Sequence, residues 1–298
     1  MNPTLVAIQI FDGLVRGSFY ALLSLGLAVI FGMLRVVNFA HGAFYMLGAF
    51  GAWLLFQRWQ VPFWLALVLA PLGVGLIGMA LERTLIRRLY KVDPLYNFLL
   101  TFGTALAVQD AMRLKYGIQG KPYVPPEQLR GVTDIGPTFY PTYRLFAIVF
   151  ALVVCFAVWF LIERTKVGMI VRAATERPDL TRALGVDVDR WITPVFGFGV
   201  ALAALGGVMA APVYQVSPVM GADIIIIIFA VVVIGGLGSI LGAVVAGFLV
   251  GLIGAFSQIV PDIGPVDLGK FENALIFVVM AIVLLVRPAG LFGSAEAG

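Results

Sequence analysis

The stretch GMLRVVNFAHGAFYMLGAFG, residues 32–51, decides the fold class and contains the first candidate site. An apolar run over 20–34 stops at Arg35, and a second apolar run then contains Asn38, His41 and several small residues. His41 is the only histidine among 298 residues. Lipid cannot satisfy polar groups or irregular backbone, so a break of this kind at membrane depth needs a cavity or a protein neighbour. The pattern predicts an interrupted membrane helix that lines a transport pathway.

The composition of the chain indicates an all-α polytopic membrane protein. Hydrophobic residues make up 61% and charged residues 12% of the chain, and its mean hydropathy is +1.02. An ordinary soluble domain is about half apolar and about a quarter charged. The basic residues lie between apolar runs, as membrane topology requires, so the net charge of +4 does not indicate nucleic-acid binding. The one cysteine, Cys155, lies within an apolar run, which excludes an intrachain disulfide and a thiol metal site.

Nine apolar runs approach the length of a spanning helix, which is roughly 20 residues. Glycines and a serine interrupt the stretch 222–257, which is therefore either one broken element or two crossings. We expect eight or nine spans, one or two of them glycine-interrupted, in a single transmembrane domain over 1–298. The expected spans are 14–34, 40–57, 62–82, 95–114, 145–162, 192–213, 222–235, 239–257 and 272–287.

Lysine and arginine placement predicts the orientation of the chain. Loops 83–93 and 163–191 are both rich in basic residues, and two spans separate them, so both are expected in the cytoplasm. The loop 115–143 contains prolines and charges of both signs, and is expected outside. Arg287 places the end of the last helix inside, so an odd number of spans puts the N-terminus outside.

The break after residue 34 offers a candidate site. Asn38 is a favourable N-cap and predicts a helix over Phe39–Phe56, with His41 one turn in. If this start lies at depth, its free N–H groups form a positive helix end that can meet a carboxylate. Two interpretations stay open for Asn38 and His41: they line a solute path, or they clamp neighbouring helices. The candidate path residues are Asn38, Phe39, His41, Gly42, Phe44, Met46, Gly235, Gly236, Gly238 and Ser239.

The basic loop 163–191 predicts a short helix over Asp179–Leu184 on the cytoplasmic face. Pro178 suits the first helical position, Asp179 favours the positive helix start, and Gly185 can end the helix in left-handed geometry. Small apolar residues among the basic ones suit docking to a soluble partner, and a solvated loop is the alternative. The candidate docking residues are Arg172, Ala173, Ala174, Pro178, Arg182, Ala183, Leu184 and Gly185.

Two glycine motifs do not indicate a nucleotide site. Residues 73–78 match GxGxxG, but they lie inside one apolar span with no strand before them, where small residues favour helix packing. Residues 264–271 nearly match a Walker A loop, but Phe271 replaces the Ser or Thr that would hold magnesium. No catalytic or metal-ligating set accompanies them, so we expect no enzyme activity and no bound cofactor. An ATP-driven step would need another subunit.

The chain resembles the H-type permease subunits of bacterial branched-chain amino-acid ABC importers. The resemblance rests on four stretches: 13–51 with its NFAHG block, the loop 163–185, VIGGLGSILGAVVAG at 233–247, and RPAGLFG at 287–293. Met169 departs from the pattern, since an arginine is expected there, which puts a basic ATPase contact at that position in doubt. The resemblance implies a multi-pass permease of the bacterial plasma (inner) membrane that passes hydrophobic amino acids.

The resemblance also implies partners. A second related permease or a second copy of this chain would complete the path, two cytoplasmic ATP-binding subunits would use the ATP, and an external substrate-binding protein would deliver the solute. The ATPases would act on a coupling helix in 163–191. Urea and short-chain amide permeases share the NFAHG block and remain an alternative. An ion-coupled carrier is a further one, but it needs a deep acidic residue, whereas Asp12, Asp110 and Asp223 lie toward span ends. Asp12 with Arg16, and Asp110 with Arg113, can each pair along one helix face.

Overall fold

The computed structural model describes residues 3–34, 37–90, 92–136, 138–176, 178–259 and 271–293, so Arg35, Arg177 and most of the Walker-like stretch 264–271 lie outside the described residues. The regular structure of the described part is almost entirely helical, which confirms the all-α class. Its helices are α1 (Pro3–Leu34), α2 (His41–Trp59), α3 (Phe63–Thr84), η1 (Ile86–Leu89), α4 (Pro94–Tyr116), η2 (Glu127–Leu129), α5 (Thr142–Arg164), α6 (Lys166–Glu176), α7 (Pro178–Ala183), α8 (Asp189–Tyr214), α9 (Met220–Gly235), α10 (Ile240–Ser257) and α11 (Glu272–Val286). A short antiparallel hairpin joins β1 (Val132–Asp134) to β2 (Phe139–Pro141).

Each of the nine expected spans coincides with one helix: α1 to α5 and α8 to α11. Among the described residues, five helices are long and apolar enough to cross a membrane, namely α1, α3, α5, α8 and α10. Helices α9 and α11 are apolar but shorter, at 16 and 15 residues. The ambiguous stretch 222–257 forms two helices, because Gly236 and Gly238 adopt φ of +104° and +84°, a left-handed conformation that ends α9.

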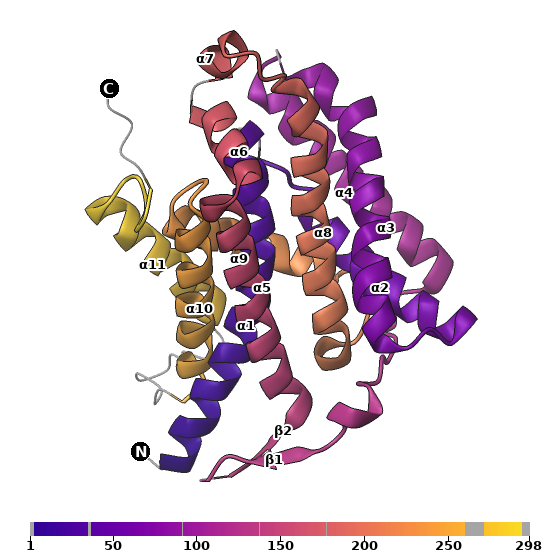
Figure 1. The fold of residues 1–298 in the computed structure, drawn as a ribbon. Coiled ribbons are helices and arrows are strands. Elements are labelled where there is room, and N and C mark those ends of the chain that lie inside the picture. Colours follow the sequence, from indigo (N-terminus) through magenta and orange to yellow (C-terminus); the bar gives the residue numbers. More distant parts are fainter. Residues whose placement is uncertain are drawn as a thin grey trace.

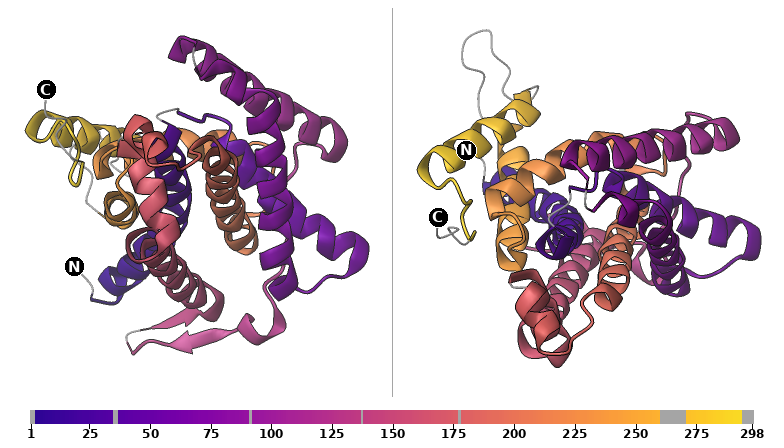
Figure 2. Two further views of the ribbon diagram at one scale, coloured as in Figure 1. Left: turned by 45° about the horizontal axis from the view of Figure 1, so that its top comes forward. Right: turned by 90° about the horizontal axis from the view of Figure 1, so that it is seen from above.

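The two long loops lie at opposite ends of the bundle. The start of α1 and the hairpin β1–β2 of loop 115–143 lie at one end, whereas α6 and α7 of loop 163–191 lie at the other (Figure 1). This is the arrangement that the distribution of basic residues predicted. Seen from one end, α10 and α11 lie on one side and α2 to α4 on the other, with α1 and α8 between them (Figure 2).

Small residues allow the central helices to approach closely. Gly48 of α2 packs against the backbone of Ala204 of α8, and Gly251 of α10 packs against the backbone of Gly17 of α1. Lipid tails are as apolar as leucine, so membrane helices associate through close packing rather than through a hydrophobic driving force. The crossings of α2 with α8 and of α1 with α10 therefore depend on the absence of side chains at these positions.

The charged residues of α1 pair with other helices rather than with each other. Arg144 Nη1 of α5 lies 2.9 Å from Asp12 Oδ1, and Arg16 Nη1 lies 2.6 Å from Glu272 Oε1 of α11. The expected Asp12–Arg16 pair is therefore wrong. Asp12 and Arg16 each bind a partner on a different neighbouring helix, and these two ion pairs join α1 to α5 and to α11.

The Gly48 crossing gives a stability prediction. Gly48→Val would drive a branched side chain into the α8 backbone, and overpacking of this kind costs typically about 1–3 kcal/mol. We expect a lower Tm in detergent. Gly103→Val on α4 is the matched control, since a Cβ at Gly103 meets no atom within 4 Å. Equal Tm values for the two variants would contradict the crossing.

Candidate functional site

Helix α2 begins inside the bundle and not at its end. The nitrogen Nε2 of His41, its first residue, lies 3.0 Å from the carbonyl oxygen of Leu23 on α1. Leu23 is near the middle of the expected span 14–34. Helix α1 ends at Leu34, whereas α2 starts at His41 beside Leu23, well before that end of α1. This geometry puts a helix N-terminus at depth.

Asn38 shapes the turn before α2 but is not its N-cap. Its Oδ1 accepts a hydrogen bond from the Ala40 N–H at 3.1 Å, and its carbonyl oxygen accepts one from the His41 N–H at 3.1 Å. Ala40 occupies the N-cap, so the prediction of a helix that starts at Phe39 with an Asn38 cap is wrong. An asparagine that bonds the backbone two residues on forms a turn of its own, which delays the helix.

Four buried polar side-chain atoms have no hydrogen-bond partner among the described residues. They are Nδ2 of Asn38, Nδ1 of His41, Oδ1 of Asn97 on α4 and Oη of Tyr123. Because a carbonyl oxygen only accepts, Nε2 of His41 must carry the proton toward Leu23, which leaves Nδ1 as an acceptor. An unpaired buried group costs about 1–3 kcal/mol, so Asn38, His41 and Asn97 leave one donor and two acceptors unused at this cost.

A second helix start meets the first. Gly42 in the first turn of α2 and Gly221 in the first turn of α9 are in backbone contact, and a Cβ on either would overlap the carbonyl oxygen of the other. The first N–H groups of a helix have no partner within it and form its positive end. Two such ends therefore lie together, close to the unpaired atoms of Asn38 and His41.

A cavity of about 350 Å³ lies beside this crossing. Phe39 contributes one wall, where its ring meets Phe98 of α4 edge-on at 4.8 Å and Phe229 of α9 at 5.9 Å. Gln109 is the only polar side chain among the residues that line the cavity. The lining comprises Phe39, Ala43 and Met46; Phe98, Phe102, Ala105, Leu106 and Gln109 of α4; and Pro218, Gly221, Ala222, Ile225 and Ile226 at the start of α9.

The structure separates the candidate path residues into two places. Phe39 and Met46 line the cavity, and Gly42 contacts Gly221 of its wall, whereas Asn38 and His41 are fully buried and do not line it. Phe44 is 3% exposed within the core. Gly235, Gly236, Gly238 and Ser239 instead form the α9–α10 turn, where Gly238 faces Gly32 at the end of α1 and the Ser239 hydroxyl caps α10. The glycine turn is therefore a packing element near one end of α1, away from the cavity.

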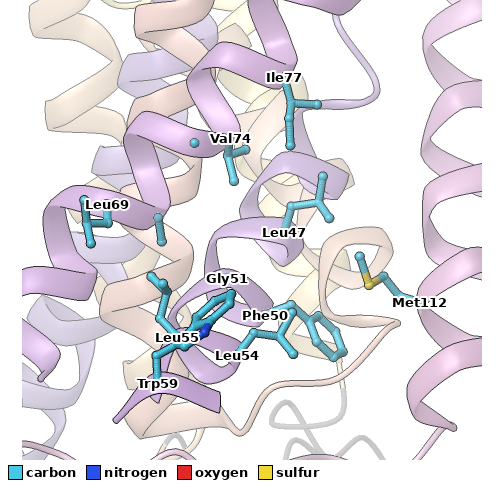
Figure 3. A pocket seen from close by; sticks show the side chains of 12 residues that line it. Leu47, Phe50, Gly51, Leu54, Leu55, Trp59, Leu69, Val74, Ile77 and Met112 are labelled. Carbon is cyan, nitrogen blue, oxygen red and sulfur yellow. The ribbon is translucent and has the colours of Figure 1, made fainter. Parts of the chain in front are cut away.

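A larger cavity, of about 500 Å³, lies between α2, α3 and α4 (Figure 3). Leucines and a valine from α2 and α3 face Phe50 and Trp59 there, and Met112 of α4 borders it. None of the candidate path residues lines it. It offers no polar side chain other than an indole, so it has nothing to bind the charged ends of an amino acid.

The segment 163–191 contains two helices rather than one. The expected short helix is present as α7, and Gly185 ends it with φ of +84°, as predicted. The sequence analysis missed α6, which packs beside α5 and α7. Its apolar residues at 167, 170, 171 and 174 have the spacing of one helix face and were the available signal.

The exposed apolar surface of this segment differs from the expected one. Ala174 is 4% exposed and packs inward, so its expected surface position is wrong. Leu184, Met169 and Leu180 are instead 85%, 61% and 54% exposed. Ala173 and Ala183 are exposed beside them.

The basic candidates of this segment are paired within it. Arg172 lies 2.9 Å from Glu163 of α5. Arg182 lies 3.4 Å from Asp179 and 3.3 Å from Asp189. Leu184 is therefore exposed beside arginines whose charges are already paired.

Among the described residues, five helices are long and apolar enough to cross a membrane, and α2 starts within the bundle beside an apolar cavity, an arrangement typical of multi-pass membrane transport proteins. A family model described as "branched-chain amino acid transport system / permease component" matches residues 9–285. The chain therefore belongs to this permease family of the bacterial inner membrane.

Curated relatives agree with this assignment. The chain is 28% identical to the high-affinity branched-chain amino acid transport system permease protein BraD of Pseudomonas aeruginosa, over 97% of this chain and 96% of that protein. It is 26% identical to LivH of Escherichia coli K12 with the same coverage. It is 25% identical to LivM of Salmonella typhimurium, over 91% of this chain and 67% of that protein. The resemblance to H-type permeases is confirmed, and no solved structure matches the chain significantly.

The His41 contact gives a second stability prediction. His41→Ala removes a fully buried ring and its bond to α1, and large-to-small changes in a core cost about 2–5 kcal/mol. His41→Gln keeps an amide N–H that can donate to the Leu23 carbonyl oxygen, so this variant is expected to lose less stability than His41→Ala. Thermal unfolding in detergent ranks the three proteins. If His41→Ala is as stable as the wild type, the ring does not join α1 to α2.

Proposed function

We propose that this chain is the transmembrane permease subunit of an ATP-binding-cassette importer for hydrophobic, branched-chain amino acids. The family match over 9–285 is the observation that supports this most strongly. The chain acts as a transporter and not as an enzyme, and the ATP is used by two separate cytoplasmic subunits. An external substrate-binding protein delivers the solute. A second permease, of the kind that LivM represents, or a second copy of this chain completes the path.

The cavity beside the α2–α9 crossing forms this chain's part of the solute path. A hydrophobic amino acid needs polar groups for its two charged ends and an apolar surface for its side chain. The start of α9 in the cavity wall offers N–H donors to a carboxylate, and the amide oxygen of Gln109 can accept from an ammonium group. The apolar walls suit the side chain, and a volume of about 350 Å³ lies within the usual range of ligand pockets, about 300–1,000 Å³.

The cavity opens at the surface of the single chain. Phe102, Leu106 and Ile226 line it and are 44%, 46% and 55% exposed. Helix α4 buries only Asn97 and Thr101 against the described part of this chain. A second permease that covers α4 and α9 would close the path, which is why we place the partner on this side.

Helices α6 and α7 form the surface that receives the ATPases. Helix α7 lies at the end of the bundle opposite the hairpin β1–β2 (Figure 1), and Leu180 in it and Leu184 just after it are 54% and 85% exposed. Exposed leucines on a pair of helices suit binding in an apolar groove of a soluble partner. A loop that stays solvated has no such reason to expose leucine.

Reconstitution tests the proposal. The purified chain in vesicles is expected to neither hydrolyse ATP nor move leucine along a proton gradient. Vesicles that also contain the partner permease and ATPases are expected to accumulate leucine when ATP and the loaded binding protein are present. Leucine uptake by the chain alone would refute the proposal of an ATP-driven importer. Uptake of urea but not of leucine would instead assign the chain to the urea and short-chain amide permeases.

The docking surface supplies a matched pair of variants for the same assay. Leu184→Glu is expected to abolish co-purification of the ATPases and stimulated ATP hydrolysis, because an unpaired charge buried on docking costs several kcal/mol. Val132→Glu adds the same charge at an exposed apolar residue (66% exposed) of the opposite end, and is expected to keep the ATPases bound. Bound ATPases in both variants would place docking elsewhere.

Single-cysteine labelling tests the path. Cys155 is 4% exposed, so the natural chain gives a low background. Ala222→Cys on the cavity wall is expected to react with a charged, membrane-impermeant maleimide, because only a thiol in contact with water ionises readily, and leucine is expected to slow the reaction. Val153→Cys, at a 60% exposed residue of α5, is expected to remain unlabelled within lipid. No labelling of Ala222→Cys would show that the cavity is not part of a water-filled path.

A further inference from the structure

Glu82 is a buried carboxyl group at the end of α3. It is 0% exposed, and it belongs neither to the cavity nor to the docking surface described above. A buried carboxyl group is costly unless it is hydrogen-bonded. Tyr90 Oη donates to its Oε1 at 2.7 Å, and Thr193 Oγ1 donates to its Oε2 at 2.5 Å. Among the described residues, both hydrogen-bond partners of Glu82 are therefore neutral hydroxyl groups.

These two bonds join three elements at the α6–α7 end of the bundle. Tyr90 follows η1 in the basic loop 83–93, and Thr193 lies in the first two turns of α8, the helix that leads out of segment 163–191. Burial, and then the hydrogen bond to Glu82, raise the pKa of Tyr90 well above its ordinary value. The Tyr90 hydroxyl therefore stays protonated and keeps donating. Glu82 thus fixes the start of α8 to the end of α3.

A further contact extends this junction to α7. Arg182 Nη2 lies 3.3 Å from Oδ1 of Asp189, the first residue of α8, and Thr193 follows one turn later. The Arg182 side chain is half-exposed, so this ion pair is weak by itself. The Glu82 carboxyl group is fully buried and its two hydroxyl donors are partly buried, which makes its contacts the stronger of the two links.

The route continues from α3 toward the cavity. A Cβ at Gly78 of α3 would lie 2.8 Å from Val200 of α8, and one at Gly51 of α2 would lie 3.2 Å from Ala70 of α3. Tightly packed helices move as units rather than deform. A displacement at the start of α8 therefore either moves α3 and α2 with it or breaks the bonds to Glu82.

We propose that Glu82, Thr193 and Tyr90 form the joint through which movement of the segment 163–191 reaches the helices around the solute cavity. Glu82 is a positioning residue in this scheme, since it touches no solute and no nucleotide. The proposal rests on the proposed function, because a joint of this kind has a purpose only if ATPases drive α6 and α7.

The test compares reconstituted importers that contain the wild-type chain, Glu82→Gln or Thr193→Val. Gln has the size of Glu but places an NH₂ group where one hydroxyl donates, and Val has the shape of Thr without the hydroxyl. Leucine uptake and ATP hydrolysis are measured in the same vesicles, and their ratio reports coupling. Residues along a coupling route alter coupling by about 2- to 30-fold, and we expect the ratio to fall within that range while assembly and basal ATP hydrolysis persist.

Two controls separate a joint from general damage. Thr193→Ser retains the hydroxyl and is expected to keep the wild-type ratio. Thr84→Val removes a hydroxyl two residues from Glu82, but this hydroxyl donates within its own helix, to the Ala80 carbonyl oxygen at 2.7 Å. Its importer is expected to behave as the wild type does.

The outcomes distinguish the joint from the importer itself. A wild-type ratio in both Glu82→Gln and Thr193→Val overturns the joint. A proportional fall of uptake and ATP hydrolysis, or loss of assembly, assigns these residues a structural role and overturns it as well. If the wild-type importer moves no leucine, the proposed function fails, and the wild-type vesicles reveal this independently of the variants.

Discussion

The backbone contact between Gly42 and Gly221 is the interaction on which the candidate site depends. A helix that starts within a bilayer exposes N–H groups that lipid cannot satisfy, so it persists only beside protein or water. Here the first turns of α2 and α9 are in backbone contact, which is possible because neither Gly42 nor Gly221 has a side chain. The cavity and its aromatic wall at Phe39 lie beside that crossing, and Asn38 and His41, with their unpaired atoms, come just before Gly42 in the chain.

Close packing elsewhere in the bundle supports this arrangement. Gly48 and Gly251 bring α2 against α8 and α10 against α1, and the ion pairs of Asp12 and Arg16 tie α1 to α5 and α11. Because helices in lipid gain little from hydrophobic burial, these contacts supply much of what orients α1 and α8. Two well-anchored central helices then leave α4 and the start of α9 at the surface, with their apolar side chains exposed beside the cavity.

The sequence predicted the nine helices well, because a bilayer fixes the length of an apolar run and charge fixes the ends. It also located the break at NFAHG, since Asn38 and His41 are conspicuous among apolar residues. It could not locate the cavity, because α4 and α9 are brought to α2 only by tertiary packing. Glu82 was equally hidden: its partners lie 8 and 111 residues away, and nothing in a span end distinguishes a buried carboxyl group from a solvated one.

The solute cavity and the docking surface on α6 and α7 lie apart, so the fold must transmit movement from one to the other. The proposed solute contacts lie where α2 and α9 begin, at the level of Leu23 of α1, whereas Leu180 of α7 and Leu184 after it are exposed at one end of the bundle. No single helix of the described part contains both surfaces. Force applied at α7 must therefore cross between helices, and α8, which begins beside α7 and crosses α2 at Gly48 and α3 at Gly78, is the helix that meets both regions. A surface ion pair such as Arg182–Asp189 is weakened by salt and water, whereas a fully buried carboxyl group held by two hydroxyls is less affected. In the proposed scheme, a firm link between α3 and α8 is the physical reason for a buried acid at this place in an otherwise apolar span.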